Sequence, residues 1–209
     1  HFSLTFIVSP TMNQEERNAL RTALRQSRNA LSPAQQQAAA HAIQSTILAQ
    51  DFFQSAQRLA FYHHVDGEID TSGLLTTALN AGKSCFLPVI DTEQGGFMAF
   101  APYSADTKLV ENQWGIAEPP APDAIGSPTE LDVVFVPLVG FDEGCFRLGM
   151  GKGYYDRTFS FKIFNRGSKP LLIGLAHECQ LTEPFPVASW DVRLDAVITD
   201  QKIYRPDTA

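Results

Sequence analysis

The chain has 209 residues, of which 44% are hydrophobic and 19% charged, a balance that supports a packed core and argues against a disordered chain. A formal net charge of −7 argues against a general nucleic-acid or anionic-membrane binder, and no apolar stretch approaches the roughly 20 residues of a membrane helix. The three cysteines are odd in number and far apart, so they indicate neither a disulfide framework nor a zinc site, and we expect a cytoplasmic protein.

The N-terminal part of the chain is predicted to be helical. We interpret residues 1–11 as an N-terminal extension or a remnant of expression, because they lack the basic start and the long apolar core of a secretory signal. Apolar residues recur at helical spacing from 13 to 29, and Ser32-Pro33 is a typical start for a second helix that reaches about Gln50. Residues 12–209 are expected to form a single α/β domain.

Strands and helices then alternate. Residues 132–139 form the most apolar β-branched run and predict a buried central strand. A helix is predicted over 70–80, closed by Gly82, and residues 118–128 are expected to be a Pro-rich surface loop. Further strands are predicted at 59–62, 85–89, 97–101, 171–176 and 194–199. This order predicts a three-layer α/β/α sandwich with a mostly parallel, mixed central sheet and an N-terminal helical pair.

A glycine-rich segment carries the densest chemical signal. The sequence from Arg147 to Gly153 reads R-L-G-M-G-K-G, and a strand that runs into it and on to a helix would present backbone N–H groups to phosphate oxygens. Arg147 and Lys152 add positive charge. The alternative is that the glycines only permit a tight turn between strand and helix. The spacing is neither a Walker A motif, since Gly153 follows Lys152, nor G-x-G-x-x-G.

The first predicted helix carries a stripe of arginines spaced by four, four and three residues, namely Arg17, Arg21, Arg25 and Arg28. From helical periodicity we expect this stripe to lie on the side of the helix opposite Leu20 and Leu24. Such a stripe is ordinarily a solvated helix face. Beside a phosphate loop, it becomes a candidate lid over a triphosphate.

Two aspartates are candidate magnesium ligands. Mg²⁺ is usually bound by one or two carboxylates together with phosphate oxygens and water. Asp156 follows the glycines in the first turn of the predicted helix, where a carboxylate also simply favours the helix dipole. Asp191 precedes the last predicted strand, although an aspartate in a turn is common.

Further polar and aromatic residues are candidates for binding a ring. Glu68 lies in a turn, where exposure is the ordinary interpretation, yet its carboxylate is also able to accept paired N–H donors from a pterin. Trp114 is either a core residue or a platform that stacks a flat ring. His63 and His64 are adjacent at a predicted strand end, so they are expected to point to opposite faces, which argues against a two-histidine metal site.

An ordered set of segments resembles one known family. The segments are V-P-L-V-G-F-D followed by R-L-G-M-G-K-G-Y-Y-D-R, together with A-L-S-P, G-E-I-D-T, W-G-I-A-E-P and W-D-V-R-L-D-A-V-I-T. In this order and at these separations, from about Arg17 to Thr199, they resemble the 5-formyltetrahydrofolate cyclo-ligases, also called 5,10-methenyltetrahydrofolate synthetases. The resemblance implies ATP as co-substrate, Mg²⁺ as cofactor, a reduced folate as substrate and a monomer.

The resemblance also implies roles for single residues, with Arg17 standing where the family often has Lys. The implied ATP-binding residues are Arg17, Arg21, Arg147, Gly149, Met150, Gly151, Lys152, Gly153, Tyr154 and Tyr155. The implied catalytic residues are Arg147, Lys152 and Tyr154. The implied folate contacts are His63, Glu68, Trp114 and Tyr154. The implied magnesium ligands are Asp156 and Asp191.

Phosphoryl transfer requires positioning and charge neutralisation more than a protein nucleophile, which suits an inventory of Arg, Lys, Gly and Asp. The sequence contains no G-x-S-x-G elbow that would support covalent catalysis. Two other interpretations remain open at this point. One is a different nucleotide enzyme, such as a small-molecule kinase or a nicotinamide-dependent oxidoreductase. The other is a sugar- or folate-binding module without catalysis.

Overall fold

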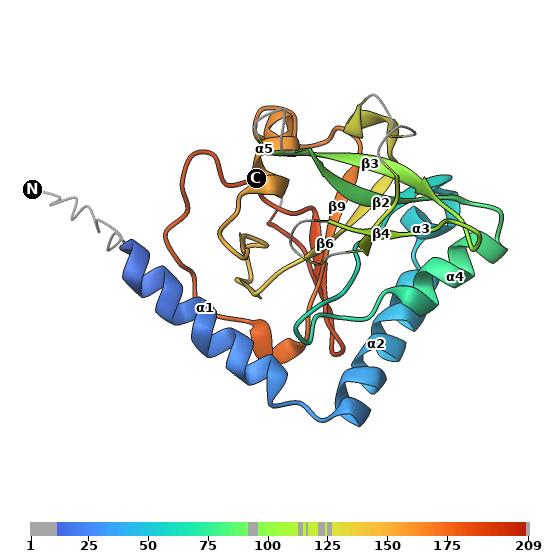
Figure 1. The fold of residues 1–209 in the computed structure, drawn as a ribbon. Coiled ribbons are helices and arrows are strands. Elements are labelled where there is room, and N and C mark those ends of the chain that lie inside the picture. Colours follow the sequence, from blue (N-terminus) through green and yellow to red (C-terminus); the bar gives the residue numbers. More distant parts are fainter. Residues whose placement is uncertain are drawn as a thin grey trace, which may run out of the picture.

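A seven-stranded sheet lies at the centre of the molecule (Figure 1). The computed structural model describes residues 12–91, 96–112, 115, 117–120, 124 and 127–207. The strand order is β11-β10-β9-β6-β1-β2-β3. The five inner strands are parallel to their neighbours, whereas β3 and β11 pair antiparallel at the two edges. The expected mostly parallel, mixed sheet is confirmed.

The strands of this sheet are β1 (Arg58–Ala60), β2 (Ser84–Asp91), β3 (Phe97–Tyr103), β6 (Val133–Pro137), β9 (Leu171–Leu175), β10 (Ala196–Ile198) and β11 (Ile203–Tyr204). Two short antiparallel pairs lie outside it, β4 (Val110–Glu111) with β5 (Ala117–Glu118) and β7 (Gly140–Phe141) with β8 (Arg147–Leu148). The helices are α1 (Gln14–Asn29), α2 (Pro33–Leu48), α3 (Asp51–Ser55), α4 (Ser72–Asn80) and α5 (Tyr154–Thr158). Short 3-10 helices are η2 (Pro128–Glu130), η3 (Ser160–Ile163) and η4 (Glu178–Gln180).

The central strand β6 is buried on both faces, as its continuous apolar sequence predicts. Val133 and Phe135 belong to the core cluster on one side of the sheet, and Val134 and Val136 belong to the cluster on the other. This alternation is the two-residue period of a strand. Helices α2, α3 and α4 cover the first side, where Ile43 and other apolar side chains are buried. On the second side, the helices of the described residues that contribute to the core are the short α5 and η3.

Helix α1 packs at the end of the sheet instead of on either face (Figure 1). Its start is set by a capping box, in which Asn13 accepts a hydrogen bond from the backbone N–H of Glu16 at 2.9 Å. Leu24 anchors it in a small cluster with Val139, Leu148 and Phe185. The helix therefore lies beside the hairpin formed by β7 and β8, which is where the glycine-rich segment begins.

Several predicted boundaries differ from the structure. The strand predicted over 59–62 ends at Ala60, and the second helix ends at Leu48, after which α3 follows. The central strand does not run directly into the glycines, because the hairpin β7–β8 intervenes. The side chain of Asp142 closes this hairpin by accepting a hydrogen bond from the backbone N–H of Phe146 at 3.0 Å. The helix after the glycines has only five residues.

Some predictions fall partly or wholly outside the described residues. Residues 1–11 lie outside them, as does much of the Pro-rich segment 118–128. That residues 12–209 form one domain stays a prediction. Within the described parts of the chain, no helix has the length and apolar character needed to cross a membrane.

Candidate active site

A pocket of about 790 Å³ opens at the carboxyl ends of β1 and β6. Tyr62 and His63, which follow β1, and Pro137 and Leu138, at the end of β6, line its floor. The strand order reverses between these two strands, since β2 lies on one side of β1 and β6 on the other. Ligands of open α/β sheets bind at such a switch point. The fold itself therefore places a ligand site here.

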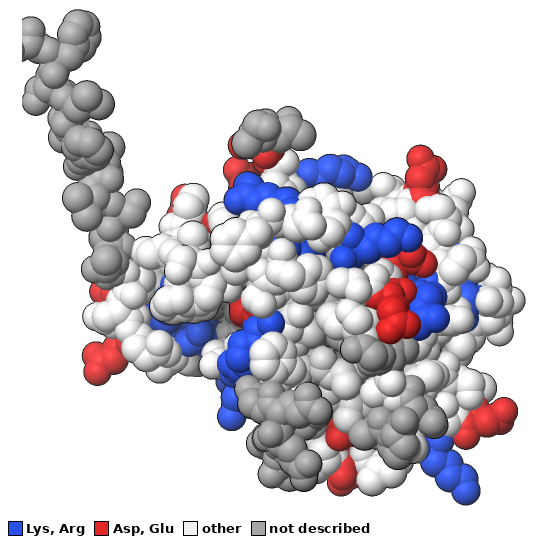
Figure 2. Space-filling view, turned by 90° about the horizontal axis from the view of Figure 1, so that it is seen from above, with Lys and Arg blue, Asp and Glu red and all other residues white. Residues whose placement is uncertain are grey.

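One half of the pocket is cationic and lined by the glycine-rich segment. The Nε of Arg21 donates a hydrogen bond to the carbonyl oxygen of Gly149 at 2.8 Å. Gly151 has a φ of +90°, which glycine adopts without strain, and a Cβ there would lie 3.5 Å from the Arg21 guanidinium carbon. The segment and α1 are thus closely packed. Figure 2 shows basic side chains running across the face of the molecule that carries α5, with acidic ones beside them and at the rim.

Arg17 joins α1 to the loop before β10. Its guanidinium donates to the carbonyl oxygen of Pro186 and lies 3.9 Å from the carboxylate of Asp191. The Asp191 carboxylate also accepts a hydrogen bond from the backbone N–H of Ala188 at 2.7 Å. Burial, followed by repulsion from Arg17, lowers the pKa of Arg21. Two guanidinium groups held this close favour an anionic ligand between them.

Arg147 is held in the pocket wall by an ion pair and an aromatic ring. Its Nη2 lies 2.8 Å from Oδ2 of Asp156, and its guanidinium stacks over the Tyr155 ring at 5.2 Å from the centroid. Only 7% of its side chain is exposed. Lys152, by contrast, is exposed, and its ammonium forms no hydrogen bond or ion pair with the residues that the structure describes. The segment therefore offers one fixed cation and one cation that is available to a ligand.

The two candidate magnesium ligands both line the pocket. Asp156 bonds Arg147 through one oxygen and accepts a hydrogen bond from the backbone N–H of Val192 at 3.1 Å through the other. Since Val192 follows Asp191, the two carboxylates lie on adjoining parts of the wall. The described residues hold no group of three or more His, Cys, Asp or Glu side chains suited to a metal. A pair of carboxylates does fit Mg²⁺ that shares its coordination with phosphate oxygens.

The other half of the pocket is largely apolar, with two carboxylates in its lining, Glu68 and Glu118, of which Glu118 accepts a hydrogen bond from the backbone N–H of Ile90 at 3.4 Å. Side chains of β2 and β3 line this half, among them Leu87, Ile90 and Met98. Glu68 accepts a hydrogen bond from the backbone N–H of Val65 at 3.1 Å. Burial raises the pKa of Glu68 to about 7, against the opposing effects of that N–H group and of Arg28. A half-desolvated carboxylate of this kind suits a ligand that offers N–H donors.

His63 lies at the pocket, but its relation to His64 differs from the expectation. The residues after Ala60 are not part of a strand, so the alternation of faces does not apply. The two rings stack with centroids 5.9 Å apart instead of pointing to opposite faces. His64 turns to Asp70, with its Nδ1 at 3.3 Å from the carboxylate. The prediction of opposite faces was wrong.

The arginine stripe also differs from the expectation. It does not lie opposite Leu20 and Leu24, because Leu24 and Arg28 are both buried and therefore share the inward side of α1. Arg17 and Arg21 reach the pocket. Arg25 and Arg28 instead bind the carboxylate of Asp66 at 2.7 and 2.9 Å. Only the first half of the stripe is thus available to a ligand.

Apart from Trp114, which lies outside the described residues, the candidate site residues all line this one pocket. They are Arg17, Arg21, His63, Glu68, Arg147, Gly149, Met150, Gly151, Lys152, Gly153, Tyr154, Tyr155, Asp156 and Asp191. Trp190, which the sequence analysis did not select, also lines the pocket and is 69% exposed. The sequence signal that could have identified Trp190 as a pocket residue was its position next to Asp191.

A mostly parallel α/β sheet with a two-part pocket at its switch point defines an α/β protein that brings an anionic ligand and a ring-bearing ligand together. Comparison with known proteins agrees. Residues 13–200 match the model of the 5-formyltetrahydrofolate cyclo-ligase family. The chain is 38% identical over 182 residues to the 5-formyltetrahydrofolate cyclo-ligase of Escherichia coli K12, covering 87% of this chain and 98% of that protein.

Two further relatives extend the match. The 5-formyltetrahydrofolate cyclo-ligase of Haemophilus influenzae is 37% identical over 185 residues, covering 88% of this chain and 97% of that protein. The solution structure of Aquifex aeolicus 5,10-methenyltetrahydrofolate synthetase superposes with a TM-score of 0.77 at 26% identity, covering 92% and 94% of the two chains. The chain belongs to the 5-formyltetrahydrofolate cyclo-ligase family and is a ligase. The family resemblance noted in the sequence is confirmed.

Proposed function

We propose that this protein converts 5-formyltetrahydrofolate to 5,10-methenyltetrahydrofolate with consumption of ATP and release of ADP and phosphate. The observation that carries the proposal is the division of one pocket into two halves. A cationic, glycine-lined half faces a largely apolar half in which the carboxylate of Glu68 is partly desolvated. Such a pocket suits a triphosphate and a reduced pterin that must react with each other.

The chemistry explains why both ligands are needed at once. The formyl group on N5 is an amide, and closure by N10 would have to expel hydroxide. If the formyl oxygen attacks the γ-phosphorus, ADP leaves and an iminium phosphate forms. N10 then attacks the formyl carbon, the N10 proton is lost, and phosphate departs with the former formyl oxygen. The methenyl bridge between N5 and N10 results, with every atom accounted for.

The cationic half supplies what phosphoryl transfer requires, namely in-line positioning and neutralisation of charge. Arg17, Arg21 and Lys152 are the proposed partners of the triphosphate oxygens. Arg147 is already oriented by Asp156 and Tyr155, so it would stabilise developing charge with little reorganisation. Backbone N–H groups of Gly149–Gly153, including Met150, complete the proposed cradle.

Asp156 and Asp191 are the proposed holders of Mg²⁺, which would neutralise phosphate charge when bound. In the present geometry both carboxylates contact arginines, at 2.8 Å for Asp156 and 3.9 Å for Asp191. Each carboxylate keeps acceptor positions beyond these contacts, because a carboxylate has about four. Their donor chemistry therefore suits a metal that is shared with the nucleotide.

The apolar half of the pocket would position the folate, whose formyl oxygen accepts the phosphoryl group. Glu68 is the proposed acceptor for N–H groups of the pterin, and His63 and Tyr154 are proposed contacts at its edges. Trp114 remains a proposed ring contact on the strength of the family resemblance. We also propose that the protein acts as a monomer in the cytoplasm on small molecules, not on nucleic acid or membranes, in keeping with its net charge of −7.

An absorbance assay tests the proposal. The purified protein is incubated with 5-formyltetrahydrofolate and Mg²⁺, with and without ATP, and methenyl absorbance is followed. Appearance of the methenyl product only with ATP, with one ADP for each product, is the expected result. A stable phosphorylated product without methenyl would indicate a kinase. Folate binding without turnover would indicate a binding module.

A further inference from the structure

The turn that carries Glu68 has an unusual backbone. The backbone N–H of Glu68 donates to the carbonyl oxygen of Val65 at 3.0 Å, so residues 65–68 form a closed turn. Its two central residues, Asp66 and Gly67, have φ angles of +52° and +76°, as type I′ turns require. A left-handed conformation is costly for a residue other than glycine, and it persists where surrounding contacts hold it. The contacts that hold this turn therefore need to be identified.

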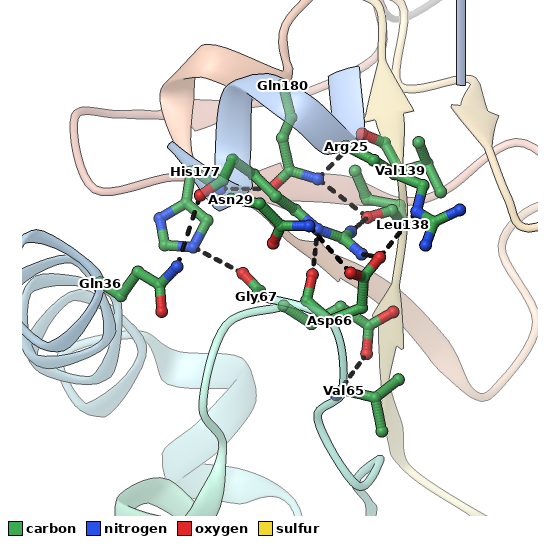
Figure 3. Close-up of polar contacts among 12 residues, drawn as sticks. Arg25, Asn29, Gln36, Val65, Asp66, Gly67, Leu138, Val139, His177 and Gln180 are labelled. Atoms are coloured by element: carbon green, nitrogen blue, oxygen red, sulfur yellow. Dashed lines mark hydrogen bonds and ion pairs between the residues drawn. The ribbon is translucent and has the colours of Figure 1, made fainter. Parts of the chain in front are cut away.

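Those contacts come from the second half of α1 (Figure 3). The Asp66 carboxylate accepts hydrogen bonds from Arg25 at 2.7 Å, Arg28 at 2.9 Å and Asn29 at 2.8 Å. Partial burial opposes its ionisation, but these three donors lower the pKa of Asp66 to about 2. The carboxylate is therefore charged at neutral pH and is bound by three side chains from the C-terminal part of α1.

Arg28 is the centre of the arrangement. Its side chain is fully buried, with 0% exposed. Besides the Asp66 carboxylate, it donates to the backbone carbonyl of Asp66 at 2.7 Å and to that of Leu138, just beyond β6, at 3.1 Å. One guanidinium thus joins α1, the turn and the end of the central strand. A planar group with five fixed donors is suited to such a junction.

The far side of the turn is held as well. Nε2 of His177 lies 3.1 Å from the carbonyl oxygen of Gly67, so this nitrogen carries the proton in that hydrogen bond. Gln180 donates to the carbonyl oxygens of Leu138 and Val139, both at 2.9 Å. A Cβ at Gly67 would lie 2.3 Å from the side-chain oxygen of Asn29, which shows how closely the turn and helix meet.

We propose that Arg28 and Asp66 are positioning residues that hold the Glu68 carboxylate in the folate half of the pocket. A partly buried carboxylate is better solvated outside the pocket, so the turn must be fixed for Glu68 to remain at the wall. The anchor consists of two ion pairs to the Asp66 carboxylate and three further hydrogen bonds to the turn, all from residues outside the turn. This inference rests on the proposed function, since it assigns the task of the anchor to folate binding.

The test compares Asp66→Asn with Asp132→Asn. Asp132 is a matched carboxylate, since it accepts hydrogen bonds from the backbone of Gln57 and Arg58 and from Lys169, but at the opposite end of β6. Asp66→Asn is expected to raise the KM for 5-formyltetrahydrofolate by about tenfold to a hundredfold, the effect of a misplaced binding group, with the KM for ATP almost unchanged. Asp132→Asn should lower the Tm similarly and leave both KM values unchanged.

Asn29→Ala provides a milder variant in case Asp66→Asn does not fold. It removes one hydrogen bond to Asp66 and should raise the folate KM in the same direction, by about twofold to fivefold. Equal folate KM values for wild type, Asp66→Asn and Asn29→Ala would overturn the proposal. So would an equal rise in Asp132→Asn, since that result would reflect general destabilisation.

Calorimetric titration with 5-formyltetrahydrofolate alone separates this inference from the proposed function. If the wild type binds the folate but does not turn it over, the proposed reaction fails, and the Kd values of the variants still decide the role of Arg28 and Asp66. A wild-type protein that neither binds nor converts the folate would overturn both. Weaker binding in Asp66→Asn than in Asp132→Asn is the supporting result.

Discussion

The two halves of helix α1 carry the same residue type at nearly the same spacing, yet they have different surroundings. Arg17 and Arg21 face backbone carbonyl oxygens and the distant carboxylate of Asp191, at 3.9 Å. Arg25 and Arg28 face a charged carboxylate at 2.7 and 2.9 Å. Each pair faces one carboxylate, but only in the second pair is that carboxylate bound directly by both guanidinium groups, so the first pair remains more available to an anionic ligand. The partner groups on the surface that α1 packs against decide which arginine is available to a ligand. Helical periodicity alone does not.

The largest effect that separates the two halves is on stability. Arg28→Met removes the fully buried cation that pairs with Asp66, together with its hydrogen bonds to the carbonyl oxygens of Asp66 and Leu138. Since Asp66 keeps Arg25 and Asn29 as partners, the loss in the free energy of unfolding is that of three hydrogen bonds, about 3 kcal/mol. Arg21→Met, in the other half, removes one partly exposed hydrogen bond and should cost about 1.5 kcal/mol or less. Urea unfolding of both variants checks the difference, and equal losses would contradict the contrast.

Helix α1 and helix α2 were predictable because their signals are local. Asn13 and Ser32 each form a capping box within four residues of the helix start. The central position of β6 followed from its unbroken apolar sequence. The burial of Arg28 was not predictable, since its partner Asp66 is 38 residues away and a helical arginine is ordinarily exposed.

The candidate site also has parts that the sequence predicts and parts that it does not. The glycine-rich segment, its cations and both aspartates are close in sequence or belong to family motifs, and they line one pocket. The hairpin β7–β8 was missed because two-residue strands carry no periodicity, although Asp142-Glu143-Gly144 is a turn signal. The stacking of His63 on His64 depends on where β1 ends, and strand ends are poorly defined by local sequence.

Asp156→Asn tests whether the cationic half of the pocket needs a carboxylate for a metal or only for Arg147. If Asp156 binds Mg²⁺, the variant should require about tenfold or more Mg²⁺ for half-maximal activity, as the loss of one charged ligand implies. Titration of activity against Mg²⁺ measures this requirement. A variant with lower kcat but an unchanged Mg²⁺ dependence would restrict Asp156 to orienting Arg147.

Lys152→Ala removes the cation that the structure leaves available. Because a charge-assisted hydrogen bond contributes about 1.5–3 kcal/mol, the KM for ATP should rise at least about tenfold, while the KM for folate changes little. Lys83→Ala is a suitable control, since Lys83 bonds backbone carbonyls of Gln54 and Ala56 away from the pocket. Steady-state kinetics equal to those of the wild type would remove Lys152 from the proposed site.

Glu68→Gln should have the smallest effect of these substitutions. Unlike Arg28→Met, it should raise the stability of the fold at neutral and higher pH. Burial raises the pKa of Glu68 to about 7, with Arg28 opposing and Asp66 assisting, and Tyr62 and Tyr155 face it from the neighbouring elements. The folded state therefore holds this proton more tightly than the unfolded state, and stability is lost as pH rises from about 4.5 to 7. Glutamine avoids that loss.

Thermal unfolding checks this expectation at two pH values. Glu68→Gln should have a higher Tm than the wild type at pH 8 and an equal Tm near pH 4. Its affinity for 5-formyltetrahydrofolate should fall, because the amide has one acceptor oxygen in place of two and carries no negative charge. A loss confined to ATP affinity would show that Glu68 belongs to the other half of the pocket.

The central claim is that the first half of α1 and the glycine-rich segment bind a triphosphate beside the folate. Calorimetric titration of a non-hydrolysable ATP analogue with Mg²⁺ into the folate-saturated protein tests it most directly. The account predicts one binding site in the wild type, retained in Arg25→Ala and weakened in Arg21→Ala. No heat of binding in the folded wild type, or equal affinity in the two variants, would contradict it.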